Sequence, residues 1–260
     1  MANYINKDIY APLIEKFYKE AAPYYGCGYP YGPFIPYTMP RYPQAGKKIV
    51  YIGRDTYYWA GREALMKSMR DGKPEDYLTV NSKVLKPEDI VNGYNNNSGS
   101  FWNFVAKLHL LIRTGHYYDD IRQTGADELR LIEEIGYGNL NSIELPKTLE
   151  NEGTLNEITS MEDYGKLRNA GQVFEKIKTI LEAYHPDLIV ILNWEERDDI
   201  FDGLHVHWQK DYYIDARRAV YTIDGYATRI IWTSHPRRFS FLKTNPQEMA
   251  GLLYDTVKLL

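Results

Sequence analysis

The chain has 260 residues and a mass of 30.4 kDa, enough for one large domain or two small ones. Hydrophobic residues make up 44% and charged residues 25%, which argues against a disordered, collagen-like or coiled-coil protein. With 31 basic and 35 acidic residues the net charge is −4, so overall positive charge does not drive nucleic-acid binding. A local basic groove is still compatible with this balance.

Membrane and disulfide signals are weak throughout. No apolar stretch approaches the roughly 20 residues that cross a bilayer, and the first residues lack the basic and then apolar run of a signal peptide. The single cysteine, Cys27, cannot form an internal disulfide, and no Cys/His cluster has the spacing of a zinc site. We therefore expect a cytoplasmic protein.

Helical and extended patterns alternate in the first part of the chain. Residues 5–20 have apolar positions at helical spacing and predict an opening helix. Residues 22–46 are rich in Tyr, Pro and Gly and predict a long loop, which either forms a lid or site wall or wraps the edges of the core. Residues 48–52 predict a buried strand and residues 59–69 a helix, and we interpret residues 71–98 as an irregular insertion.

The second part continues this alternation. Helices are predicted at residues 101–112, 127–135, 163–184 and 246–260, and extended segments at 137–145, 187–192 and 228–233. Residues 150–162 are interpreted as a surface insertion. Strands separated by helices predict a mostly parallel sheet. We expect one α/β domain over residues 1–260, a three-layer sandwich whose central four-stranded sheet is flanked by helices.

Ligands of such sheets bind beyond the carboxyl ends of the strands, and polar residues follow three of the predicted strands. Asp55 lies in Gly-Arg-Asp-Thr-Tyr-Tyr, where a carboxylate either activates water or caps the next helix. Asn141 lies in Leu-Asn-Ser-Ile-Glu-Leu, and its amide either recognises a base edge or occupies a turn. His235 lies in Ser-His-Pro-Arg-Arg-Phe-Ser, and the proline after it predicts an extended exit from the strand.

In this order the three motifs resemble those of the uracil-DNA glycosylase superfamily. Its best known branch has Gly-Gln-Asp-Pro-Tyr-His after the first strand, Leu-Asn after a middle strand and His-Pro-Ser-Pro-Leu-Ser after the last. The chain is similar to a divergent member over residues 48–242. It departs from the pattern at Arg54, Thr56 and Tyr58, and two arginines replace the Ser-Pro that follows His-Pro.

The resemblance implies a DNA base-excision glycosylase, which flips uracil or a related damaged base out of the helix and hydrolyses its N-glycosidic bond. Asp55 would orient water or stabilise the sugar cation, and His235 would donate a hydrogen bond to the base as negative charge develops there. Tyr57 would exclude a 5-methyl group, Asn141 would pair with the uracil edge, and Tyr77 would supply the stacking aromatic ring.

The loop after His235 is the predicted DNA contact. Arg237, Arg238 and Ser240 offer hydrogen-bond donors to phosphates, while Phe239, or its neighbours Phe241 and Leu242, would fill the gap that a flipped base leaves. The chemistry that the resemblance implies needs neither a metal nor an organic cofactor. The expected partner is lesion-containing DNA or a nucleobase ligand, and we expect a monomer.

Two other hypotheses are open at this stage. The chain could keep the glycosylase fold but bind a nucleobase, nucleotide or nucleic acid without cleavage, a hypothesis that the replacements around Asp55 favour. Alternatively the three motifs are coincidental in an unrelated α/β protein, although no Gly-x-Ser-x-Gly elbow, P-loop or dinucleotide fingerprint supports a specific one. His205 and His207 alternate as metal ligands can, but lack a third ligand and favour a structural pair.

Overall fold

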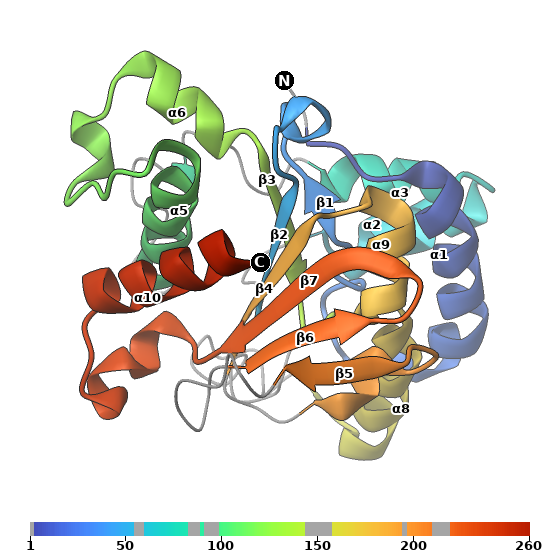
Figure 1. Ribbon diagram of the computed structural model, residues 1–260. Coiled ribbons are helices and arrows are strands. Elements are labelled where there is room, and N and C mark those ends of the chain that lie inside the picture. Colours follow the sequence, from blue (N-terminus) through green and yellow to red (C-terminus); the bar gives the residue numbers. More distant parts are fainter. Residues whose placement is uncertain are drawn as a thin grey trace.

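The computed structural model of the chain describes residues 3–54, 60–82, 89–90, 99–143, 158–193, 197–209 and 219–260. Within these residues a mixed sheet runs through the centre and helices lie on both of its faces (Figure 1). The predicted α/β class is therefore confirmed. None of the described helices combines the length and the apolar character that crossing a membrane requires.

The sheet contains seven strands among the described residues, in the order β1-β3-β2-β4-β7-β6-β5. The four central strands, β3, β2, β4 and β7, are parallel to one another, whereas β1 and the β5–β6 pair add antiparallel edges. The prediction of four strands is thus wrong for the sheet as a whole. The strands are β1 (Tyr37–Thr38), β2 (Ile49–Gly53), β3 (Ile135–Asn139), β4 (Leu188–Leu192), β5 (Val206–Gln209), β6 (Ala219–Ile223) and β7 (Tyr226–Thr233).

The additional strands lie at the edges, where burial imposes little pattern on the sequence. β1 has only two residues and belongs to the segment 22–46, which was predicted to be a loop. His207 and Trp208 of β5 are both exposed, so this strand lacks the alternation of a half-buried strand. Neither edge could therefore be recognised from apolar periodicity.

The central strands bring their ends to one side of the sheet. All five residues of β2 and of β4 are buried, as expected for parallel strands covered on both faces. In the register of the sheet Gly53 pairs with Asn139, and Leu192 pairs with Thr233. The ends of β2, β3, β4 and β7 and the described residues next to them therefore form one rim, called here the carboxyl edge.

Helices α5, α6 and α10 cover one face of the sheet, and α1, α2, α3, α8 and α9 cover the other (Figure 1). A capping box formed by Asn245 and Glu248 begins the last helix, with Pro246 in its first turn. The helices are α1 (Lys7–Ala21), α2 (Arg62–Arg70), α3 (Pro74–Asn81), α5 (Gly99–Thr114), α6 (Ala126–Ile132), α8 (Met161–Gly171), α9 (Ile177–Tyr184) and α10 (Pro246–Leu259).

Three sequence-based boundaries are corrected by the structure. The predicted helix at 163–184 is two helices, α8 and α9, separated by a short 3-10 turn, η5 (Gln172–Phe174), and by the buried Glu175. The predicted helix at 127–135 ends earlier, because β3 begins at Ile135. The region 71–98, predicted as irregular, contains α3, while 83–88 and 91–98 lie outside the described residues.

The Tyr- and Pro-rich segment 22–46 packs against the body of the protein. Tyr29, Phe34 and Tyr37 in it are almost completely buried, and Phe34 and Tyr37 pack edge-on against Tyr137 of β3. Of the two interpretations left open by the sequence, these contacts favour the aromatic wrap over the lid. The predicted insertion at 150–162 falls mostly outside the described residues.

Candidate functional site

The backbone holds the motif-bearing strand ends together beyond the strands themselves. The amide N–H of Asn141 donates to the carbonyl oxygen of Arg54 at 3.1 Å, and that of Asn193 donates to Thr233 at 2.9 Å. Arg54 immediately precedes Asp55 in the chain. The loops after β2 and β3 are therefore in direct contact at the carboxyl edge.

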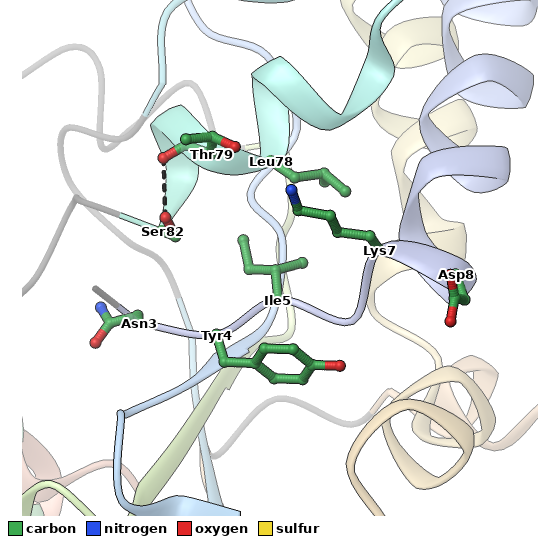
Figure 2. A pocket seen from close by; sticks show the side chains of 8 residues that line it. All are labelled: Asn3, Tyr4, Ile5, Lys7, Asp8, Leu78, Thr79 and Ser82. Atoms are coloured by element: carbon green, nitrogen blue, oxygen red, sulfur yellow. Dashed lines mark hydrogen bonds between the residues drawn. The ribbon is translucent and has the colours of Figure 1, made fainter. Parts of the chain in front are cut away.

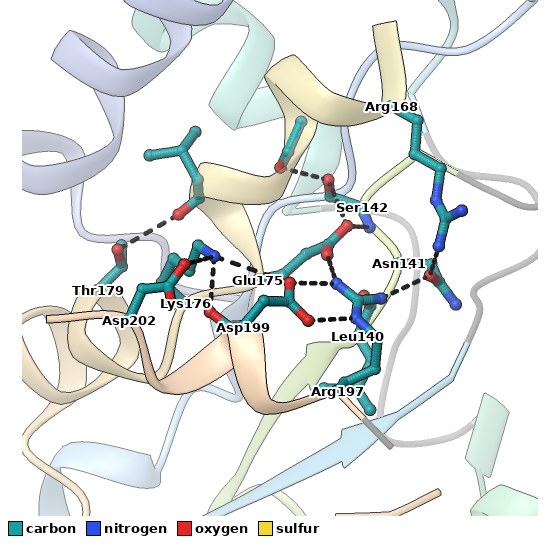
Figure 3. A network of polar contacts seen from close by, with 12 residues as sticks. Leu140, Asn141, Ser142, Arg168, Glu175, Lys176, Thr179, Arg197, Asp199 and Asp202 are labelled. Atoms are coloured by element: carbon teal, nitrogen blue, oxygen red, sulfur yellow. Dashed lines mark hydrogen bonds and ion pairs between the residues drawn. The ribbon is translucent and has the colours of Figure 1, made fainter. Parts of the chain in front are cut away.

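Asn141 is completely buried, and both ends of its side-chain amide are hydrogen-bonded; Figure 3 shows the two arginines at its oxygen. Its Nδ2 donates to the carbonyl oxygen of Arg54 at 3.0 Å. Its Oδ1 accepts from Arg197 Nη1 at 3.1 Å and from Arg168 Nη2 at 3.4 Å. Because guanidinium groups only donate and a carbonyl only accepts, these contacts determine which end of the amide is oxygen.

Arg197 connects this amide to two carboxylates. Its Nη2 lies 2.6 Å from Oε2 of Glu175, and its Nε lies 2.7 Å from Oδ1 of Asp199 (Figure 3). Glu175 Oε1 in turn accepts the backbone N–H of Ser142 at 2.7 Å. The Arg197–Glu175 pair therefore contacts the residues on both sides of Asn141, since Arg197 Nη1 also donates to the carbonyl of Leu140 at 2.9 Å.

Burial and charge compete in this pair. Burial raises the pKa of Glu175, and the charge of Arg197 together with the hydrogen bond from Ser142 opposes the rise. Burial also disfavours the charged form of Arg197, which lowers its pKa. Hydrogen bonds and charge from Asp199 and Glu175 outweigh this effect and raise the pKa of Arg197 above its usual range. The guanidinium is therefore a permanent cation in the site.

His235 follows β7 on the same edge and caps the short helix η8 (Pro236–Leu242). Its Nδ1 accepts the backbone N–H of Arg237 at 3.2 Å, so in the neutral ring the proton resides on Nε2. Burial lowers the pKa of His235 to about 4, helped by the nearby charges of Arg237, Arg54 and Arg238. At neutral pH the imidazole is uncharged and carries an Nε2–H donor.

Phe101 links the first and the last motif. Its ring stacks on that of His235, with centroids 5.6 Å apart and planes 25° apart. A Cβ built on Gly53 would lie 3.2 Å from the Phe101 ring, so the end of β2 packs against the same side chain. The sequence analysis missed Phe101 as a site residue because the run 101–112 has the composition of an ordinary core helix.

Asp55 and Tyr57 lie outside the described residues, so their predicted roles stay predictions. Tyr77 is completely buried on α3, and its hydroxyl donates to the carbonyl of Pro33 at 2.8 Å. Stacking on a base requires an accessible ring face, which Tyr77 does not present here. The structure thus does not bring Tyr77 to the carboxyl edge surface with His235.

The predicted DNA-contact loop divides into buried and exposed residues. Phe239 is 1% exposed and packs on Phe104 with centroids 4.9 Å apart, so it belongs to the core. Arg237 and Ser240 are exposed. Phe241 is 75% exposed and lies beneath the guanidinium of Arg238, which is 5.4 Å from the ring centroid.

Three polar residues of the site were not identified from sequence. Glu175 and Arg168 lie within the predicted helix at 163–184, and Arg197 lies in a stretch rich in acidic residues, outside the three motifs. No local sequence pattern indicates that these three charged side chains are shielded from water, because their contacts join segments that are distant in sequence.

Among the described residues, no three His, Cys, Asp or Glu side chains gather as the ligands of a metal ion would. His207 pairs instead with Asp224 on the surface of the β5–β6 hairpin, with Nε2 and Oδ1 2.9 Å apart. This contact supports the structural interpretation of the histidine pair.

A cavity of about 250 Å³ lies elsewhere, between the start of α1 and the end of α3 (Figure 2). None of its lining residues belongs to the three motifs. They are Asn3, Tyr4, Ile5, Lys7, Asp8, Leu78, Thr79 and Ser82.

Comparison with protein-family models, with curated proteins and with solved structures finds no match to this chain. The functional argument therefore depends on the residues of the carboxyl edge.

Proposed function

We propose that the protein is a DNA glycosylase, which hydrolyses the N-glycosidic bond of uracil or a related damaged base. One observation carries the proposal: the three motif-bearing strand ends converge. Asn141 is hydrogen-bonded to Arg54, the neighbour of Asp55, and His235 shares Phe101 with Gly53. Residues nearly 200 positions apart in sequence thus form one edge.

The state of His235 suits this chemistry. Breaking an N-glycosidic bond leaves a cationic sugar and an anionic base, so donors aimed at the base stabilise the transition state more than the substrate. A neutral imidazole with its proton on Nε2 is such a donor, because Nδ1 is already occupied by the N–H of Arg237. Asp55, one residue beyond Arg54, would supply the carboxylate for the sugar cation.

The exposed part of η8 suits a flipped-base complex. Arg237 and Ser240 are exposed donors of the kind that contact phosphate groups, and the exposed Phe241 belongs to the same short helix. A side chain of this size could occupy the gap in the base stack. In this proposal Phe241 takes the inserting role, since Phe239 packs in the core.

A second candidate function is the binding of a nucleobase or nucleic acid without cleavage. The replacements at Arg54, Thr56 and Tyr58 favour it, because they change the motif around the expected catalytic carboxylate, and the contacts of Asn141 bear on either candidate. Reading the donor and acceptor of a uracil edge would require Arg168 or Arg197 to release the amide oxygen.

The test is the release of free base from duplex DNA that contains one uracil, followed under single-turnover conditions and extended to other damaged bases. We expect release by the wild type and a rate at least about 100-fold lower for Asp55→Asn and for His235→Ala. His205→Ala is the matched control, because His205 is exposed and precedes β5 at the opposite end of the strands. Tight binding of DNA without release would select the second candidate, and neither binding nor release would reject both.

A further inference from the structure

Arg197 uses its whole hydrogen-bonding capacity around Asn141. A guanidinium has five N–H groups, and five hydrogen bonds leave Arg197. The acceptors belong to Leu140, Asn141, Glu175 and, through both of its carboxylate oxygens, Asp199. Figure 3 shows these contacts meeting at one guanidinium. A side chain bonded in this way has one geometry.

The same guanidinium determines the orientation of the Asn141 amide. If the amide turned over, its NH₂ group would face Arg197 and Arg168, and its oxygen would face the carbonyl of Arg54. Two contacts would then place a donor against a donor, and the third would place an acceptor against an acceptor. Leaving buried polar groups without partners is unfavourable, so the observed orientation is strongly preferred.

The backbone around Asn141 is held by the same ion pair. Arg197 binds the carbonyl of Leu140, and Glu175, which is 1% exposed, binds the N–H of Ser142. Glu175 Oε1 also lies 3.2 Å from the hydroxyl oxygen of Ser142. The residue predicted to read the base is therefore bracketed on both sides by the Arg197–Glu175 pair.

We propose that Arg197 is a positioning residue of this site, which holds the Asn141 amide with its oxygen turned to the guanidinium and thereby closes that oxygen to the ligand. The relevance to base recognition rests on the proposed function; the positioning itself rests on the contacts. Asn141 then does not accept a hydrogen bond from a base N–H unless Arg197 releases it.

The decisive variant is Arg197→Lys, because lysine keeps the charge but loses the planar fork. Arg113→Lys is the matched control, because Arg113 also pairs with a shielded carboxylate, Glu134, which precedes the start of β3 and so lies away from the carboxyl edge. The readout is the side-chain NH₂ signal pair of Asn141 in ¹H–¹⁵N spectra, identified by its loss in Asn141→Ser. We expect Arg197→Lys to shift these signals and to speed their exchange with water at least about tenfold, with no such change in Arg113→Lys.

Asp199→Asn provides a milder second variant, because Asp199 is one-third exposed and its loss leaves Arg197 in place. It should change the same signals in the same direction, by about threefold in exchange rate. Folded Arg197→Lys and Asp199→Asn proteins with unchanged Asn141 signals would overturn the inference.

Base release separates this inference from the proposed function. If the wild type releases uracil, Arg197→Lys should lower kcat at least about tenfold, because the Asn141 amide is no longer held in one orientation, and it should leave KM for DNA within about twofold, because η8, the proposed phosphate contact, is unchanged. If the wild type releases no base, the proposed function fails, and the Asn141 signals still decide whether Arg197 positions the amide.

Discussion

Two buried Arg–Glu pairs at different places in the sheet show what distinguishes a site from a structural contact. Arg197 and Glu175 approach within 2.6 Å at the carboxyl edge, and their contacts continue to Asn141. Arg113 and Glu134 approach within 3.1 Å where α5 meets the start of β3.

The second pair is less well formed. Arg113 Nε and Glu134 Oε2 are close, but neither makes a hydrogen bond of good geometry among the described residues. Both pairs are shielded from water, so burial alone does not mark a functional residue. Arg197 differs from Arg113 because it contacts residues that follow three different strands or helices.

The largest expected effect comes from removing each arginine. Arg197→Met should lower the free energy of unfolding by about 3–5 kcal/mol, because it leaves Glu175 buried without its cation. Arg113→Met should cost about half as much, since its pair is poorly aligned. Urea denaturation with matched m-values measures both. Equal losses would remove the distinction between the two pairs.

Each region also contains an imidazole whose pKa is lowered. Burial lowers the pKa of His109 to about 3, with a contribution from Arg113, and burial lowers that of His235 to about 4. A lowered histidine pKa makes the unfolded chain bind more protons, so stability is complete above about pH 6.5 and falls as the pH drops toward 4.

Between pH 6.5 and pH 4 the free energy of unfolding should therefore fall by up to about 3 kcal/mol less in His235→Gln than in the wild type. The pH dependence that remains in this range should come mainly from His109. Denaturant titrations at several pH values measure the slope. An unchanged slope in His235→Gln would mean that His235 is not a neutral, shielded imidazole.

Two glycines allow a comparison of tolerance to a methyl group. At Gly136 a Cβ would meet Val50 Cγ2 at 2.7 Å, while at Gly53 the nearest atom is Tyr137 Oη at 3.1 Å. Gly136→Ala should cost about 2 kcal/mol through overpacking and Gly53→Ala about 1 kcal/mol. Because Gly53 packs on Phe101, only Gly53→Ala should also slow base release. Thermal unfolding and the release assay together test this, and the opposite pattern would place the site elsewhere.

The smallest effect on stability is expected at Phe241. Phe241→Ala should change the free energy of unfolding by less than about 0.5 kcal/mol, since the ring is 75% exposed. It should weaken binding of uracil-containing duplex about fivefold, because it removes the ring that is proposed to fill the gap in the base stack. Leu259→Ala, at a residue 70% exposed on α10, is the control and should leave DNA binding unchanged. Equal DNA binding by both variants would remove Phe241 from the contact.

The central strands could be predicted because a strand that is buried on both faces consists almost entirely of apolar residues. β2 and β4 are apolar over their whole lengths, and both were predicted within two residues of their bounds. β3 was placed late, because Gly136 and Gly138 interrupt its apolar pattern. The exposed edge strands carry no comparable local signal.

The site was predictable only in part for the same reason. Asn141 and His235 could be found because their motifs resemble those of a known superfamily and lie near the ends of strands, where parallel sheets gather ligands. Arg197 and Glu175 act through contacts across 22 residues of sequence, and Arg197 reaches Asn141 across 56. Neither an apolar periodicity nor a short motif in the sequence indicates such contacts.

The central claim, that the carboxyl edge hydrolyses an N-glycosidic bond, is tested most directly by counting free uracil against bound DNA in one reaction. With enzyme in excess over a duplex containing a single uracil, the wild type should release about one uracil per duplex. His235→Ala should bind the duplex but release uracil at less than about one hundredth of the wild-type rate. Duplex that is bound by the wild type and recovered with its uracil intact would contradict the claim.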